Sequence, residues 1–361
     1  KNEDQLRKSV AATAIIGCIL SLFVIFIGAV GLYPLLQFLG TPSAIVSQSY
    51  LYISTIVNGV AVTFAYNLCA GLLRAVGDSL AALYFLIIAA ILNILLDLYF
   101  ITQLHLGVQS AGIATIIAQG ISALLCLLYI RKKVPFLLPH RKDFVWDKEL
   151  YQDLLSQGLA MGLMTSIVSI GTVILQSAIN QLGTTIISAQ VAARRIMSFA
   201  VLPITAIASS ITTFISQNFG AEQFQRIKKG VTIANLLSWV WSVLVAALLF
   251  FTSPSLTSFI SGSTNPDLIA NASLYLQISS CFYPILASLI ILRNALQGMG
   301  KKLTPLTSSF IELFGKIFFV LWIIPHTGYM GVILCEPLIW IPMTLQLIII
   351  YRKIRYQLLT E

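Results

Sequence analysis

Apolar residues run along this chain in blocks of about twenty, and short polar stretches separate the blocks. A helix of about 20 apolar residues crosses the roughly 30 Å hydrocarbon core of a bilayer. The blocks lie at residues 11–32, 51–73, 81–101, 111–130, 158–179, 196–215, 231–251, 274–291, 303–324 and 330–351. This pattern predicts an all-α polytopic membrane protein with about ten transmembrane helices.

Composition and charge exclude several other classes of protein. Only 10% of the 361 residues are charged, against about 25% in a soluble globular protein. The net charge of +9 does not indicate a nucleic-acid partner, because the basic residues are scattered between apolar blocks and form no single face. Neither an HExxH nor a GxSxG motif is present, so we expect no enzyme activity.

The positions of Lys and Arg predict the orientation of the chain in the membrane. Nineteen of the 22 basic residues lie before the first block or after the second, fourth, sixth, eighth and tenth blocks. Cytoplasmic connectors carry an excess of Lys and Arg, so alternate connectors should be cytoplasmic. We therefore expect a multi-pass protein of the cell (inner) membrane, with both termini of this chain in the cytoplasm.

The longest basic connector divides the chain into two predicted lobes. We place the N-terminal lobe at residues 1–133 with four spans, the cytoplasmic linker at 134–150, and the C-terminal lobe at 151–361 with six spans. Pro135 and Pro139 in the linker support a break in helical structure.

The two lobes resemble each other when the second is shifted back by about 220 residues. Residues 73–78 (LRAVGD) then match residues 296–301 (LQGMGK), and Gly107 matches Gly328. On this register the first span pairs with the seventh, so the fifth and sixth spans have no counterpart in the first lobe. This indicates a transporter fold of 6 + 6 helices in parallel repeats, with two helices absent from the start.

Short motifs in both lobes resemble one family of transporters. In the first lobe they are Arg74-Ala75-x-Gly77-Asp78, residues 93–97 (NILLD) and residues 106–115 (LGVQSAGIAT); in the second they are residues 192–196 (AARRI), 217–221 (QNFGA) and 296–300 (LQGMG). In this order they resemble the multidrug and toxic compound extrusion (MATE) family, in its DinF-like branch. The family has twelve spans, so the resemblance also implies that the first two helices are lacking.

Asp97 is the strongest candidate for chemistry, because it lies inside an apolar span with Asn93 one turn before it. A carboxylate in hydrocarbon costs about 2.5–3.5 kcal/mol on insertion scales. It is either a structural acid that a neighbouring hydroxyl satisfies, or a site for H⁺ or Na⁺, with Asn93 as a neutral ligand in the case of Na⁺. The resemblance implies the second reading and adds Thr115, because similar positions in DinF-like proteins form such a site with an acid from the first helix.

The remaining embedded charges lie in the second lobe. Glu312 precedes Lys316 by four residues, the favoured spacing for an ion pair on one helix face. Glu336 either serves a charge on the substrate or reaches the outer surface. Arg194 and Arg195 open the sixth predicted span, where we expect them to extend to the interface or to bind a carbonyl rather than the substrate.

Aromatic and polar residues of the spans are candidates for the lining of a substrate cavity. We assign Tyr66, Asn67, Tyr283 and Glu336 to this lining, with core or lipid packing as the alternative for the first three. Aromatic faces suit flat cationic compounds.

The function expected from this sequence is secondary active efflux. We expect an antiporter that exports lipophilic, cationic drugs or toxic organic cations in exchange for H⁺ or Na⁺ by alternating access. The alternative is a flippase for lipid-linked glycans of the same superfamily, which uses basic residues in its cavity. We expect a monomer in the lipid bilayer, with no cofactor besides the coupling ion and no metal besides Na⁺ at Asp97.

Overall fold

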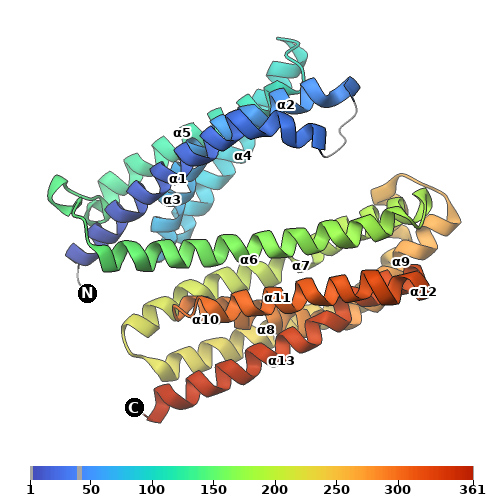
Figure 1. The fold of residues 1–361 in the computed structure, drawn as a ribbon. Helices are drawn as coiled ribbons and strands as arrows, with labels where there is room; N and C mark the ends of the chain where they lie inside the picture. Colours follow the sequence, from blue (N-terminus) through green and yellow to red (C-terminus); the bar gives the residue numbers. More distant parts are fainter. Residues whose placement is uncertain (1–2, 39–42, 361) are drawn as a thin grey trace. The chain divides into compact units, whose positions relative to one another are not determined.

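The structure, a computed structural model, describes residues 3–38 and 43–360, and all of the elements in these ranges are helical (Figure 1). The chain forms two compact units, Lys1–Leu155 and Ser156–Glu361. The linker and the first two turns of the helix after it thus belong with the first unit.

Within residues 3–38 and 43–155, the first unit contains five complete helices, the linker and the start of α6 (Lys148–Asn180). The complete helices are α1 (Glu3–Phe38), α2 (Ser43–Asn58), α3 (Val60–Ala75), α4 (Ser79–Thr102) and α5 (Gln109–Lys133). Helix α5 packs against α3 and α4. Asp78 caps α4, because its carboxylate accepts from the Ala81 N–H at 3.1 Å and from the Tyr129 hydroxyl of α5 at 2.9 Å. This one side chain both starts α4 and ties it to α5.

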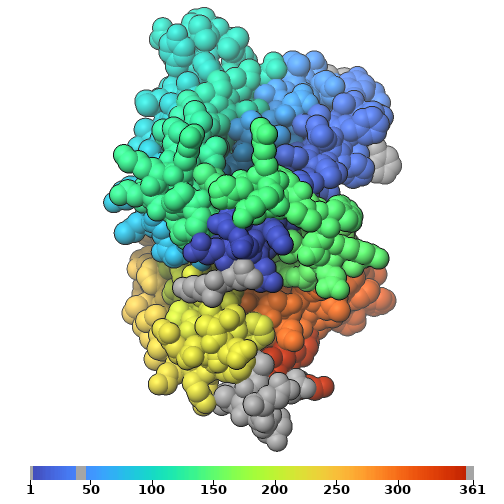
Figure 2. All heavy atoms as spheres, turned by 90° about the vertical axis from the view of Figure 1, so that its left-hand side faces the viewer, coloured from blue at the N-terminus to red at the C-terminus, as the bar shows by residue number. Residues whose placement is uncertain are grey.

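The linker folds onto the start of α1. It contains two short 3-10 turns, η1 (Pro135–Leu137) and η2 (Arg141–Asp143). The Asp143 side chain is only 3% exposed; it accepts from the His140 backbone N–H at 2.7 Å and lies 3.5 Å from Arg7 Nε. Figure 2 shows the first turns of α1 in dark blue beside the green of the linker and of the start of α6. The carboxylate of Asp143 thus joins the linker to the N-terminal helix.

The second unit contains the longer helices and most of the buried apolar side chains. Its elements are α6 (Lys148–Asn180), α7 (Thr184–Gly220), α8 (Phe224–Ser261), α9 (Pro266–Cys281), α10 (Tyr283–Gly298), α11 (Leu303–Phe318), the π-helical turn η3 (Phe319–Ile323), α12 (Ile324–Thr327) and α13 (Tyr329–Thr360). Helix α7 packs against α8, α9 and α10, and α13 packs against α10 and α11. The core of the unit lies among these helices.

The number of membrane-crossing segments agrees with the ten apolar blocks. Among the described residues, eight helices are long and apolar enough to cross a bilayer, and two bent helix pairs bring the number to ten. The bent pairs are Val46–Asn58 with Val60–Ala75 and Pro266–Cys281 with Tyr283–Gly298, which bend by 46° and 58° and correspond to the predicted blocks 51–73 and 274–291. Gly59 lies at the first break, and Pro284, which lacks an N–H, follows the second.

The internal repeat is visible in the backbone. The breaks at Gly59 and Phe282 are 223 positions apart, as are the turn glycines Gly77 and Gly300, which have φ angles of 91° and 73°. Both turns close with the same pair of hydrogen bonds, from the glycine N–H to the carbonyl three residues before it and from the next N–H to the carbonyl five residues before it. A positive φ favours glycine at both positions.

The contacts of Asp143 with His140 and Arg7 predict a defined pH dependence. The His140 N–H bond, together with the nearby Arg7 guanidinium, lowers the pKa of Asp143 despite burial, which acts in the opposite direction. A lowered pKa stabilises the folded linker above the unfolded pKa of about 3.9, and the contribution is lost as the pH falls through the folded pKa. Asp143→Asn should therefore speed hydrogen exchange of residues 134–147 several-fold at neutral pH, with the difference from wild type vanishing only below about pH 4.

The control for this measurement is Asp267→Asn, which makes the same change at an exposed acid of the second unit. It should leave exchange in the linker unchanged. Equal exchange of wild type and Asp143→Asn at neutral pH would show that the carboxylate does not hold the linker.

A close approach of α7 and α10 predicts a stability effect. A Cβ on Gly298 would lie 2.8 Å from the Thr212 backbone oxygen and 3.2 Å from Ile215 Cβ, so the two helices would have to separate. Gly298→Ala should lower the free energy of unfolding by about 1–3 kcal/mol, measured by thermal unfolding in detergent. Gly162→Ala is the matched control, because no atom lies within 4 Å of the added Cβ, and it should not destabilise the protein.

Candidate functional site

Asp97 and its predicted partners lie where α4 meets α5. Asn93 Nδ2 donates to Thr115 Oγ1 at 3.2 Å, and the Thr115 hydroxyl donates to the Ala111 carbonyl at 2.8 Å. Asp97 Oδ1 is buried and has no hydrogen-bond partner within residues 3–38 and 43–360. The structure thus brings Asn93 and Thr115 together and leaves an Asp97 oxygen unpaired one turn away.

This arrangement suits a proton or a small hard cation. An unpaired carboxylate oxygen in an apolar helix gains from protonation or from coordinating a cation. Carboxylate, amide and hydroxyl oxygens are ligands for hard cations. Among the described residues no group of three or more His, Cys, Asp or Glu lies close enough to hold a metal ion. Any cation at Asp97 would therefore rely on neutral oxygens for its other ligands.

The other residues assigned to a cavity lie in different surroundings. Tyr66 is buried in the first unit, whereas Asn67 is exposed and donates to the Thr63 carbonyl of its own helix at 2.8 Å. Tyr283 is fully buried in the core of the second unit, and its hydroxyl has no partner in the described part of the chain. Tyr66 and Asn67 thus belong to the first unit, and Tyr283 and Glu336 to the second.

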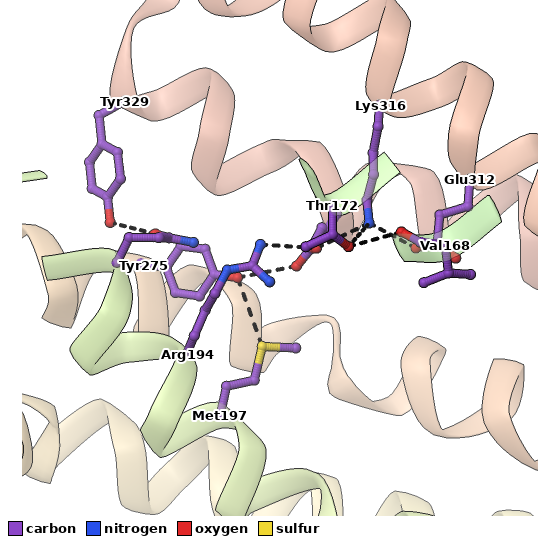
Figure 3. A network of polar contacts seen from close by, with 10 residues as sticks. Val168, Thr172, Arg194, Met197, Tyr275, Glu312, Lys316 and Tyr329 are labelled. Atoms are coloured by element: carbon purple, nitrogen blue, oxygen red, sulfur yellow. Dashed lines mark hydrogen bonds and ion pairs between the residues drawn. The ribbon is translucent and has the colours of Figure 1, made fainter. Parts of the chain in front are cut away.

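Glu336 lies at the centre of a charged cluster in the second unit. Figure 3 shows the other members of this cluster, Arg194, Glu312 and Lys316, as sticks. Its Oε1 accepts from Arg194 Nη2 of α7 at 3.1 Å and lies 3.5 Å from Lys316 Nζ of α11, while its Oε2 accepts from the Tyr275 hydroxyl of α9 at 3.3 Å. The side chain is only 12% exposed. We predicted that Glu336 either serves a charge on the substrate or reaches the outer surface. The second position is excluded, since the carboxylate lies within the helix bundle.

Lys316 extends this cluster to a second carboxylate. Its Nζ donates to Glu312 Oε1 at 2.8 Å and to the Thr172 hydroxyl of α6 at 3.4 Å. The ion pair of Glu312 and Lys316 predicted from their spacing is therefore confirmed. With Arg194 and Glu336, the cluster holds two cations and two carboxylates, so its formal charge is zero.

Arg194 is the member of the cluster whose role sequence reasoning missed. We expected it at the start of a span, where it would extend to the interface or bind a carbonyl. Helix α7 instead begins at Thr184, so Arg194 lies in its third turn and pairs with Glu336, 142 positions away. One signal in the sequence pointed to this pairing: Arg194 lies beside an apolar run, and a cation inside an apolar helix requires a compensating charge.

The two candidate sites occupy corresponding positions of the internal repeat. Asn93 and Lys316 are 223 positions apart, and Thr115 and Glu336 are 221 apart, the offset that also relates Gly107 to Gly328. The amide–hydroxyl contact in the first unit thus corresponds to an ammonium–carboxylate contact in the second. The turn η3, a π-helical segment of a kind common at functional sites, begins close to the position that corresponds to Asp97.

A cavity of about 530 Å³ lies beside the charged cluster. Its charged lining consists of Arg194, Glu312, Lys316 and Glu336, and helices α6, α7, α10 and α13 supply apolar side chains. A volume of about 300–1,000 Å³ is typical of sites for small molecules. The second unit by itself therefore contains a pocket with both apolar walls and charged groups.

Comparison with known proteins agrees with this architecture. The MatE family model matches residues 1–99 and 160–322. The probable multidrug resistance protein YoeA of Bacillus subtilis is 24% identical over 334 residues, which are 90% of this chain and 72% of that protein. The probable multidrug resistance protein YpnP of Bacillus subtilis is 28% identical over 281 residues, 77% of this chain and 62% of that protein. The chain thus matches less than two thirds of the length of YpnP.

A solved structure shows that the fold is shared. The crystal structure of MATE in complex with MaL6 has a TM-score of 0.89 and 19% sequence identity, over 99% of this chain and 85% of that chain. The family model, in turn, covers well over half of the residues. The chain therefore belongs to the MATE family of membrane transporters.

Proposed function

We propose that the protein exports lipophilic, cationic compounds from the cell by antiport with H⁺ or Na⁺. The observation that carries this proposal is the buried, unpaired Asp97 oxygen beside the contact between Asn93 and Thr115. A carboxylate of this kind loses its charge when it binds H⁺ and coordinates the cation when it binds Na⁺. Relatives named as multidrug resistance proteins support the substrate class.

Coupling requires only that ion and substrate prefer opposite states of the transporter. If the ion stabilises one facing state through Asp97 and the substrate stabilises the other, each reduces the affinity for the other. The internal repeat suits alternating access of this type. The protein would act as a monomer in the cell membrane with both ends of this sequence on the cytoplasmic side, and no catalytic step is proposed.

The flippase for lipid-linked glycans remains the second candidate because the charged cluster places two cations, Arg194 and Lys316, inside the second unit. Binding a pyrophosphate requires cations that are free to contact it. Lys316, however, is 3% exposed and already contacts Glu312, Glu336 and Thr172. Of these two cations, only Arg194 therefore keeps an N–H donor, at Nε, that no described residue accepts. This favours efflux over lipid transfer.

The coupling role of Asp97 predicts the loss of gradient-driven transport. Asp97→Asn removes the ionisable oxygen and keeps the shape of the side chain, so efflux of a fluorescent lipophilic cation from proteoliposomes should fall to background. The measurement is made with an imposed pH gradient and, separately, with an imposed Na⁺ gradient. The gradient that drives wild-type efflux identifies the coupling ion.

Asp267→Asn serves as the control, because it neutralises an exposed acid at the start of α9. It should transport at the wild-type rate. Efflux by Asp97→Asn at the wild-type rate would remove Asp97 from the coupling mechanism. No efflux by the wild type under either gradient would overturn antiport and leave the flippase as the leading function.

A further inference from the structure

The cavity beside the charged cluster has a composition that selects for a particular ligand charge. Its apolar walls include Leu286 and Ile290 of α10 and Trp340 of α13. Its polar groups are the four charged side chains together with hydroxyls such as those of Ser198 and Thr205. An amphipathic molecule with a flat apolar body fits such a pocket, and the charged cluster decides which polar group it carries.

Three of the four charged groups are already engaged with one another. Lys316 Nζ has three contacts, with Glu312 Oε1, Glu336 Oε1 and Thr172 Oγ1, which match its three N–H donors. Glu336 is contacted by Lys316, by Arg194 and by the Tyr275 hydroxyl. Glu312 pairs with Lys316 at 2.8 Å. None of these three groups offers the ligand an unopposed charge.

Arg194 differs from the other three. Its guanidinium contacts Glu336 through Nη2, whereas its Nε is buried and has no hydrogen-bond partner in the described part of the chain. Its side chain is 31% exposed, against 3% for Lys316 and 12% for Glu336. A guanidinium has five N–H donors in a planar fork that matches a carboxylate. The most exposed of the four charged groups of this cavity is thus a donor for an acid.

The neutrality of the cluster restricts the rest of the ligand. Two cations and two carboxylates balance, so a ligand with a single net charge leaves that charge uncompensated in a low-dielectric site. A zwitterion adds no net charge. We propose that this pocket binds lipophilic zwitterions, whose carboxylate bonds to Arg194 and whose apolar body packs against Leu286, Ile290 and Trp340. This narrows the substrates of the proposed function, on which transport rests, from cations in general to compounds that carry a carboxylate besides their cationic group.

The test compares two dyes that differ in one group. Rhodamine with a free benzoate is a zwitterion, and the methyl ester of the same dye is a cation with the same ring system. Binding of each to the whole purified protein is measured by fluorescence polarisation. Wild type should bind the free acid at least about tenfold more tightly than the ester, a difference of about 1.4 kcal/mol.

Variants assign that preference to Arg194. Arg194→Gln leaves one cation against two carboxylates, so it should weaken binding of the acid, strengthen binding of the ester and abolish or reverse the preference. Arg194→Lys should keep only part of the preference because it retains the charge without the planar fork. Arg195→Gln is the matched control, an exposed residue of the same helix with the same loss of charge, and should keep the full preference. Thermal unfolding checks that each variant is folded.

The outcomes separate this inference from the proposed function. Equal or tighter binding of the ester by wild type, no binding of the acid, or an unchanged preference in folded Arg194→Gln would each overturn the zwitterion site. If Arg194→Gln does not fold, the wild-type comparison and Arg194→Lys decide. Arg194-dependent binding without gradient-driven transport of either dye would instead overturn antiport and leave the site in place.

Discussion

The arrangement of the second unit depends on the compensation of a carboxylate inside an apolar bundle. Glu336 lies on α13 and receives its partners from three other helices, Arg194 on α7, Tyr275 on α9 and Lys316 on α11. Removing one partner of a buried ion pair typically costs about 3–5 kcal/mol, because the other charge is left uncompensated. These four helices therefore have to meet at one point, and the cavity beside it has charged groups on its wall.

The two units use corresponding positions of a duplicated sequence in different ways. In the first, the contact between α4 and α5 joins an amide and a hydroxyl, and the acid near it keeps an unpaired oxygen. In the second, the corresponding contact joins an ammonium and a carboxylate, and further charges balance it. The first arrangement leaves a carboxylate oxygen without a partner, whereas the charges of the second balance one another. The proposals accordingly assign coupling to the first unit and substrate recognition to the second.

The backbone of the repeats combines close packing with defined breaks. Gly298 allows α10 to approach the Thr212 carbonyl of α7, so two long helices pack without an intervening side chain. The bent pairs in each unit interrupt a membrane span at the same place in the repeat. At such a break several backbone groups lack their helical partners, so the two halves of a span can reorient at lower cost than within a continuous helix.

Several features of the protein follow from the sequence alone because they are local. Block length and periodicity predicted the all-α fold and the ten crossing segments, and the spacing of Glu312 and Lys316 predicted their ion pair, since residues four apart share a helix face. The glycines at 77 and 300 marked the equivalent turns, because a positive φ favours glycine there. In the candidate site, Asn93 came from its spacing to Asp97 and Thr115 from the family resemblance, and the structure joins them.

What the tertiary structure decided is everything that depends on contacts between distant segments. The start of α7 at Thr184 places Arg194 within the bundle, and its pairing with Glu336 spans 142 positions. The breaks at Gly59 and Phe282 lie inside two of the apolar blocks; Gly59 and Pro284 weaken the helix there, but the length of each block still predicts a single span. Apolar periodicity shows which residues avoid water, but it does not show which helix each face meets. The partner of a buried charge is therefore determined only when the helices pack.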